Sequence, residues 1–256
     1  MVRYCYIVAE GIQDIEFLIC LLKSYGLKRV IRFSVLDPFW KPLIPTNFLI
    51  DDDLVKRVPI PFFLRNSELS VALHSSRGVT RLSETVQESL AVISGSQIFG
   101  IGLVLDADDT QTPQKRFEEL TAKLSLLDLP VPSVLGEVMR GSPRCGIFIM
   151  PNNADSGTLE DVLLQCAQVN YPNLLELSIN YVSSINAAQL TKKDLRELNK
   201  PAGKNKAVVS SISSILKPGK SLQVSIYENR WIDEQTMVLD SVKLVKIFLD
   251  EVTGFA

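Results

Sequence analysis

The chain has 256 residues, of which 46% are hydrophobic and 22% are charged. This length is enough for one large domain or two modest ones, each with a hydrophobic core. A formal net charge of −2 excludes a globally basic nucleic-acid-binding protein, although a local basic groove remains compatible with it. The apolar runs are shorter than a membrane span and the N-terminal run is too short for a signal peptide. We therefore expect a cytoplasmic protein without a membrane partner.

The cysteines and the single histidine limit the kinds of site that the chain can build. All four cysteines lie in apolar segments without Cys-x-x-Cys spacing, which is typical of reduced core residues and not of a zinc site or a disulfide. His74 is the one histidine, which argues against a His-ligated zinc ion. If the chain binds a metal, oxygen-ligated Mg²⁺ (or Mn²⁺) is therefore the expected ion.

An apolar strand over residues 3–9 opens the chain and is followed by an amphipathic helix over residues 13–25. Glu10 comes directly after the strand, and Asp14 lies in the first turn of the helix. Negative charge is favourable at a helix N-terminus. Asp14 therefore has two interpretations, as a helix-start residue or as part of a functional site.

Residues 28–68 interrupt this pattern, because they combine five prolines with many aromatic residues and show no helical period. We expect an irregular insertion outside the main sheet, with room for short edge strands. Basic residues such as Lys56 and Arg57 alternate here with aromatic ones. That combination suits single-stranded nucleic acid, and a packed flap explains it equally well.

The most informative stretch follows a short strand over residues 69–73 and a helix over residues 79–93. An uncharged apolar strand over residues 100–105 ends abruptly at Asp106 and Asp108. Strand side chains alternate with period two, so we expect these two carboxylates to point the same way. Carboxylates held this closely need a cation, a proton or a basic group between them, and no run of basic residues nearby offers one. The alternative is a loop with a helix cap, leading into a helix over residues 113–127.

A further buried strand over residues 146–150 leads through a polar loop into a helix capped at Thr158. Glu160 would lie in the first turn of that helix, either as a helix-start carboxylate or near the other acidic residues. Alternation of apolar strands with amphipathic helices predicts an α/β fold, in which a mostly parallel sheet carries helices on both faces. Ligands of such sheets bind at the carboxyl ends of the strands.

The last third of the chain has a different character. Residues 170–200 are polar and helical. A basic turn with Lys204 and Lys206 then precedes a helix over residues 207–216. A strand-like run over residues 222–227 follows, and a helix over residues 237–252 closes the chain. We therefore divide the chain into an α/β core, residues 1–169 with the insertion at 28–68, and a C-terminal α+β extension, residues 170–256, packed on that core.

Taken together, these motifs resemble the Toprim fold, and over nearly the whole chain the sequence is similar to a poorly characterised family of stand-alone Toprim-like proteins. The matching pieces are Ile7-Val8-Ala9-Glu10-Gly11 with Asp14 and Phe17, Leu103 to Asp109, Phe148 to Asn152 with Gly157 to Asp161, and Lys206-Ala207 before the late helix. The departures are the absence of topoisomerase, primase and ATPase motifs and Ala9 before Glu10, where the family usually has Val or Ile.

Resemblance to the Toprim domain of OLD-family nucleases implies roles for individual residues. The acidic set Glu10, Asp14, Asp106, Asp108 and Glu160 would bind Mg²⁺ (or Mn²⁺), Glu10 would be a ligand or general base, and Lys206 (or Lys204) would be the assisting lysine. The chain would then be a candidate magnesium-dependent nuclease or nucleotidyl transferase acting on DNA or RNA. The sequence identifies neither a protein partner nor an oligomeric state.

Two alternatives remain open. Asp106-Ala107-Asp108-Asp109-Thr110 also fits the Asp-x-Asp-x-Thr motif of haloacid-dehalogenase-like phosphatases, with Asp106 as the phosphorylated nucleophile. That motif normally ends the first strand of its domain, whereas two strand–helix units precede it here. The second alternative is a non-catalytic Toprim-like module that binds nucleic acid or a nucleotide.

Overall fold

The computed structural model describes residues 2–45, 60–108 and 111–255 of the chain. Lys56, Arg57 and Thr110, which the sequence motifs include, lie outside these residues. The described residues contain one sheet of seven strands. The strands are β1 (Arg3–Ala9), β2 (Lys28–Val30), β3 (Phe62–Arg65), β4 (Leu69–Ser75), β5 (Ile98–Asp106), β6 (Val138–Met139) and β7 (Arg144–Met150).

The α-helices follow the expected rhythm through the first two thirds of the chain and dominate the last third. They are α1 (Ile12–Leu22), α2 (Leu82–Leu90), α3 (Pro113–Leu124), α4 (Leu159–Asn170), α5 (Pro172–Ser183), α6 (Lys192–Leu198), α7 (Gly203–Leu216), α8 (Leu222–Glu228) and α9 (Asp240–Thr253). Short 3₁₀ turns extend α1 and α3 at their C-terminal ends, so the predicted helix boundaries at residues 25 and 127 include these turns.

Strand order in the sheet is β2-β3-β4-β1-β5-β7-β6. The four central strands β4, β1, β5 and β7 are parallel. β3 is antiparallel to its neighbours β4 and β2, and β6 is antiparallel to β7. Ala9 is paired with both Ser75 and Val104. The carboxyl ends of β1, β4 and β5 therefore meet at one edge of the sheet, the edge at which the sequence places its acidic residues.

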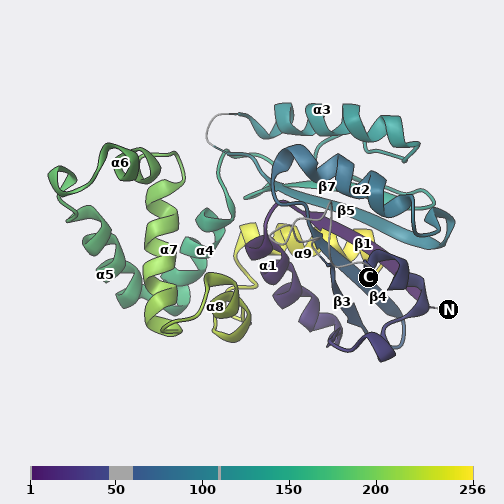
Figure 1. Ribbon diagram of the computed structural model, residues 1–256, viewed down its shortest axis with the longest axis horizontal. Helices are drawn as coiled ribbons and strands as arrows, with labels where there is room; N and C mark the ends of the chain where they lie inside the picture. Colours follow the sequence, from purple (N-terminus) through teal and green to yellow (C-terminus); the bar gives the residue numbers. More distant parts are fainter. Residues whose placement is uncertain (1, 46–59, 109–110, 256) are drawn as a thin grey trace.

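Helices cover both faces of the sheet, as predicted (Figure 1). Alternate residues of β1 belong to different cores: Ile7 packs with α1 and α9, whereas Val8 packs with α2 and α3. Both are fully buried, which explains the uninterrupted apolar run, because a strand with a helix layer on each side has no polar face. The α/β fold class is confirmed.

The expectation that residues 28–68 lie outside the sheet is wrong for β2 and β3, whereas residues 31–45 of this segment form no strand. β2 pairs with β3, and β3 pairs with β4, to make the antiparallel edge. β2 has three residues and β3 has four. Strands this short, among prolines and aromatic residues, give no recognisable alternation of apolar and polar side chains. Trp40 from the same segment is fully buried, and its indole N–H donates to Ser70 Oγ at 2.9 Å. The expected short edge strands are present.

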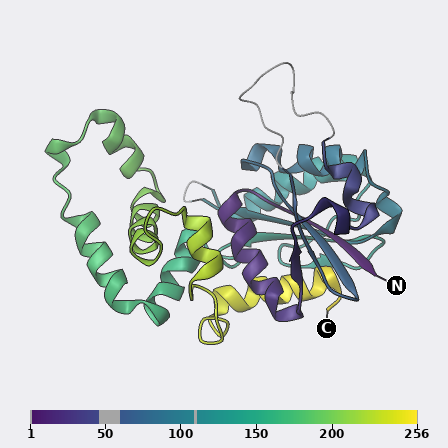
Figure 2. The same ribbon diagram turned by 60° about the horizontal axis from the view of Figure 1, so that its bottom comes forward.

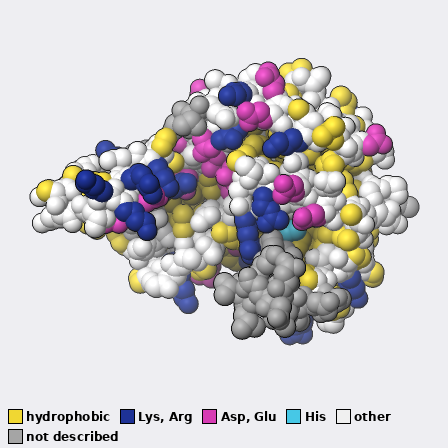
Figure 3. Space-filling view, turned by 45° about the horizontal axis from the view of Figure 1, so that its top comes forward, with side chains coloured by type: hydrophobic (Ala, Val, Ile, Leu, Met, Phe, Trp, Pro, Cys, Tyr) yellow, Lys and Arg dark blue, Asp and Glu magenta, His cyan; other side chains and the backbone are white. Residues whose placement is uncertain are grey.

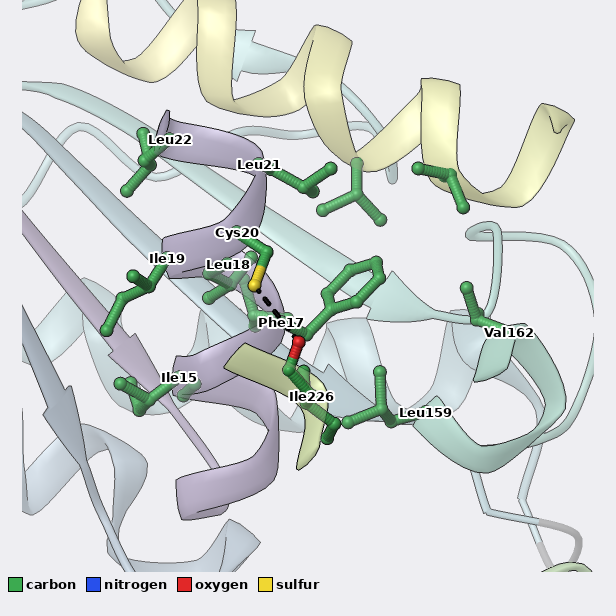
Figure 4. Packing of buried hydrophobic residues seen from close by; sticks show 14 of the residues in the cluster. Ile15, Phe17, Leu18, Ile19, Cys20, Leu21, Leu22, Leu159, Val162 and Ile226 are labelled. Atoms are coloured by element: carbon green, nitrogen blue, oxygen red, sulfur yellow. Dashed lines mark hydrogen bonds between the residues drawn. The ribbon is translucent and has the colours of Figure 1, made fainter. Parts of the chain in front are cut away.

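The strand predicted over residues 222–227 is also wrong, because these residues form the helix α8. Ile226 is fully buried and packs against α1, where the Cys20 thiol lies 3.4 Å from the Ile226 carbonyl oxygen (Figure 4). Burial against α1 outweighs the β-propensity of this run, since propensity is a weak preference beside tertiary packing. Among the described residues from 170 onward there is no strand, so the extension is helical and not α+β.

Helix α9 packs directly on the sheet, and glycines in the strands make this approach close enough. A Cβ atom at Gly100 would lie 2.1 Å from the backbone oxygen of Val252, and one at Gly146 would lie 2.8 Å from the Phe248 ring. Helix α9 is thus packed on the core. Helices α5, α6 and α7 instead extend away from the sheet as a lobe (Figures 1 and 2). The division at residue 169 stays a prediction.

Candidate functional site

Four of the predicted acidic residues come from four different elements and meet at the carboxyl edge of the sheet. Glu10 follows β1, and Asp106 is the last residue of β5, the strand beside it. The Glu10 N–H donates to the Val104 carbonyl at 3.1 Å, which fixes the register of the two strand ends. Asp14 lies in the first turn of α1 and Glu160 in the first turn of α4.

Burial and nearby negative charge raise the pKa of three of these carboxyl groups, those of Glu10, Asp14 and Asp106. Burial raises the pKa of Asp14 to about 7, and the nearby charges of Glu10 and Glu160 add to this effect. Burial likewise raises the pKa of Asp106 well above its usual range, with further contributions from Asp14, Glu10 and Glu160. The pKa of Glu10 is raised by burial and by Asp108. The four groups therefore form one electrostatic cluster, which we call the carboxylate cluster: Glu10, Asp14, Asp106 and Glu160.

Hydrogen bonds satisfy only part of this cluster. Asp14 Oδ2 accepts the Gly11 N–H at 2.7 Å, and Asp106 Oδ1 accepts the Leu159 N–H at 2.9 Å. Asp14 Oδ1 and Glu10 Oε2 are buried and have no hydrogen-bond partner among the described residues. Asp14 is only 5% exposed. One oxygen of Asp14 thus caps α1, and the other is a buried acceptor that needs a proton or a cation. A functional role for Asp14 stays a prediction.

Asp108 departs from the prediction that it points the same way as Asp106. β5 ends at Asp106, and Asp108 has the left-handed φ of 57°, so the alternation of the strand does not extend to it. Its carboxylate forms an ion pair with Arg116 of α3, while the Arg116 Nε–H donates to the Ala107 carbonyl at 3.3 Å. The expectation that no basic group compensates these carboxylates is therefore wrong for Asp108.

Arg116 is a site residue that the sequence analysis missed. The signal that could have found it is its helical spacing: it lies three residues after the buried Pro113 and four before the buried Leu120. This places it on the inward stripe of α3, where an arginine needs an acceptor. Its charge lowers the pKa of Glu10, so Arg116 also acts on the carboxylate cluster.

Lys206 approaches the cluster from the lobe. Helix α7 begins at Gly203, four residues earlier than predicted, so Lys206 lies near its start. Asn205 Nδ2 donates to Asp161 Oδ1 at 2.8 Å, and Asp161 Oδ2 accepts the Thr158 N–H at 2.7 Å in the predicted capping box of α4. This bridge joins the starts of α7 and α4. Both Lys204 and Lys206 are exposed, but only the charge of Lys206 contributes to lowering the pKa of Glu10.

The donor set of the cluster consists of oxygen atoms, which suits Mg²⁺ or Mn²⁺. In the part of the chain that the structure describes, no group of three or more His, Cys, Asp or Glu side chains is arranged as a ready-made coordination cage. The buried oxygens without partners nevertheless fit a cation. Ion binding would require the carboxylates to turn toward one another.

The four cysteines are core residues, and the single histidine contacts a core tyrosine. All four cysteines are buried and free, and burial raises the pKa of Cys5 to about 12, which makes it an unreactive thiol. His74 Nδ1 lies 2.7 Å from the hydroxyl of the buried Tyr6. No helix among the described residues is both long enough and apolar enough to cross a membrane.

Comparison with known proteins identifies a family but no function. A family model described as "Protein of unknown function (DUF3226)" matches residues 5–250. The crystal structure of the hypothetical protein PH0156 from Pyrococcus horikoshii OT3 is similar to this chain, with a TM-score of 0.54 and 18% sequence identity over 98% of this chain and 95% of the other. At this identity the likeness shows the fold alone. No curated protein matches the chain.

Proposed function

We propose that this chain, which belongs to the family described as "Protein of unknown function (DUF3226)", is a divalent-metal-dependent enzyme that hydrolyses or transfers phosphodiester bonds of nucleic acid. The observation that carries the proposal is the pair of buried, unpartnered oxygens, Asp14 Oδ1 and Glu10 Oε2. Burial, together with the charges of other members of the cluster, raises the pKa of Asp14 and of Asp106. The motif resemblance to the Toprim domain of OLD-family nucleases points to the same chemistry.

The carboxylate cluster would hold Mg²⁺ or Mn²⁺ through its oxygens, with Asp106 kept in place by the Leu159 N–H. When bound, such ions activate a water and offset charge on the leaving oxygen of a phosphodiester. Glu10 is our candidate for the group that accepts a proton, because burial raises its pKa above that of an ordinary glutamate and so makes it a stronger base. Lys206 would stabilise negative charge on the phosphate.

A non-catalytic binding module remains the second candidate, and the observation that favours it is the lack of a ready-made coordination cage among the described residues. The phosphatase alternative is less well supported. Asp106 is half-buried, and its desolvation raises its pKa well above the usual range, which disfavours the ionised form that a nucleophile needs.

A cleavage assay on the full chain separates these candidates. Single-stranded DNA, duplex DNA and RNA are incubated with Mg²⁺, Mn²⁺ or EDTA, and a phosphate monoester is tested in parallel. We expect cleavage of a polynucleotide that needs the metal, is lost in Asp14→Asn, and falls by about 10²–10³ in Lys206→Ala, the usual cost of removing one transition-state donor.

Asp194→Asn is the matched control, because Asp194 also caps a helix from its first turn but is exposed on α6; it should leave cleavage unchanged. Binding of the polynucleotide without cleavage would favour the binding module. Release of phosphate from the monoester alone would favour the phosphatase.

A further inference from the structure

Asp108 and Arg116 form a unit on the α3 side of the carboxylate cluster. Arg116 is nearly buried, with 12% of its side chain exposed, whereas 44% of the Asp108 side chain is exposed. The backbone around Asp108 is fixed independently, because the Asp108 N–H donates to the Gly157 carbonyl at 3.0 Å and the Ala107 N–H to the Met150 carbonyl at 3.1 Å. The ion pair is thus not needed to hold this loop to β7, and its geometric effect is to fix the guanidinium.

The held guanidinium has donors to spare. It carries five N–H groups in a planar fork, and its hydrogen bonds to described residues use Nε and Nη2. A fixed, planar arginine with free donors matches the geometry of phosphate oxygens. The acceptors on Asp108 and Ala107 lock its orientation, so little side-chain entropy is lost when a further acceptor binds.

A small cavity lies beside Arg116. Its volume is about 70 Å³, and it is lined by Arg116, Lys123, Thr80 and Glu119 together with the apolar residues Val79, Leu105 and Leu120. At about 10–15 Å³ for each water-sized group, the cavity holds roughly five to seven heavy atoms, which is enough for one phosphate group. Arginine, lysine and hydroxyl donors outnumber the single carboxylate in this lining, so an anion is the ligand class that it favours.

Positive side chains also lie on the other side of the carboxylates. Figure 3 shows Lys and Arg side chains over the lobe of α6 and α7 and over α3, with Asp and Glu side chains between them. The positive charges of Arg116, on α3, and Lys206, on α7, both lower the pKa of Glu10. A substrate with successive phosphates could therefore contact both cations while one phosphodiester lies at the cluster.

We propose that Arg116, held in place by the positioning residue Asp108, is the centre of a phosphate-binding subsite on the α3 side of the carboxylate cluster. The subsite takes a backbone phosphate next to the reacting one, and Asp108 is consequently not a metal ligand. This inference rests on the proposed function for the identity of its ligand, a nucleic-acid strand, and it gives the strand a path from α7 to α3.

The test measures binding and metal response separately in the full chain. Binding of a labelled single-stranded oligonucleotide is followed by fluorescence anisotropy in Ca²⁺ at several salt concentrations. Log K falls as log salt rises, and each lost phosphate contact makes this slope less steep by about 0.7 for a single strand. We expect Arg116→Ala to lose one such contact and to weaken binding by about tenfold or more. Arg116→Lys should keep the slope while binding more weakly, because it retains the charge and loses the fork.

Arg140→Ala is the control, since Arg140 is exposed and precedes β7 at the opposite edge of the sheet; it should leave the slope unchanged. Inorganic phosphate is tested as a second probe. Phosphate could raise the melting temperature of wild type but not of Arg116→Ala, while the oligonucleotide slope is the same in both proteins. That result would support the subsite and assign it to free phosphate or a monoester. If neither probe distinguishes Arg116→Ala from wild type, or if wild type binds neither, the inference is overturned.

The metal response separates this inference from the proposed function. Asp108→Asn should keep the rise in melting temperature that Mn²⁺ produces in wild type, and Asp106→Asn should lose it. Loss of the Mn²⁺ response in Asp108→Asn would contradict the positioning role of Asp108 and leave the proposed function standing. A wild type that binds the oligonucleotide through Arg116 but does not respond to Mn²⁺ would keep the subsite and refute the metal-dependent function.

Discussion

Replacing Asp14 by Asn in the metal-free protein should change how stability depends on pH. Burial raises the pKa of Asp14 from its ordinary value of 3.8 to about 7. Between about pH 4 and pH 7 the folded protein keeps a proton on Asp14 that the unfolded chain has lost, so the folded state binds more protons and its stability falls as pH rises. Below pH 4 both states are protonated and this destabilising contribution vanishes.

The size of the effect follows from the same shift. A difference of roughly three pKa units, at about 1.4 kcal/mol for each unit, gives up to about 4 kcal/mol of stability lost from pH 4 to pH 8 in EDTA. Asparagine cannot ionise and its side-chain oxygen can still accept the Gly11 N–H. Asp14→Asn should therefore be about as stable as wild type at pH 4 and more stable at pH 8.

Urea denaturation at a series of pH values in EDTA measures this difference. Asp194→Asn serves as the control, because Asp194 is an exposed residue in the same helix position, and its profile should run parallel to that of wild type. If the Asp14→Asn profile also runs parallel to wild type from pH 4 to pH 8, then Asp14 is not a buried acid with a raised pKa, and the electrostatic account of the cluster fails.

Two further predictions concern the packing of the C-terminal helices. Gly100→Ala should destabilise the protein by at least about 1–3 kcal/mol in urea denaturation, because its Cβ would overlap the Val252 carbonyl oxygen. Gly95→Ala is the control, since no atom lies within 4 Å of the added Cβ. Equal losses of stability in the two variants would refute the close packing of α9. Ile226→Ala should cost about 2–5 kcal/mol, as for other buried aliphatic residues. Val238→Ala, at a 73% exposed position, should cost far less, and a small loss at Ile226 would argue against α8 as a packed helix.

The central part of the fold could be predicted from sequence because its signals are long and redundant. β1 and β5 are uninterrupted apolar runs that end in acidic residues, and α1 and α3 repeat apolar residues at helical spacing. Parallel strands then bring Glu10 and Asp106 to one edge whatever the details of the loops. Their proximity follows from topology alone, which is why this part of the site was predictable.

The errors lie where short local signals compete with tertiary packing. The β2–β3 edge has too few residues for a reliable period, and α8 has strand-like residues that become helical against α1. At the site, the direction of Asp108 depends on one backbone torsion angle beyond the strand, and Arg116 reaches it from a separate helix. Neither the torsion angle nor the ion pair is encoded in the spacing of Asp106 and Asp108.

Mn²⁺ binding to the full chain tests the central claim most directly. Mn²⁺ is titrated at pH 8, with free ion followed by electron paramagnetic resonance and the melting temperature recorded at each step. Saturable binding of one or two ions with a rise in melting temperature is the predicted result for wild type and for Asp194→Asn, and both signals should vanish in the double variant Asp14→Asn/Asp106→Asn. Absence of saturable binding in wild type, or equal binding in the double variant, would contradict a metal site at the carboxylate cluster.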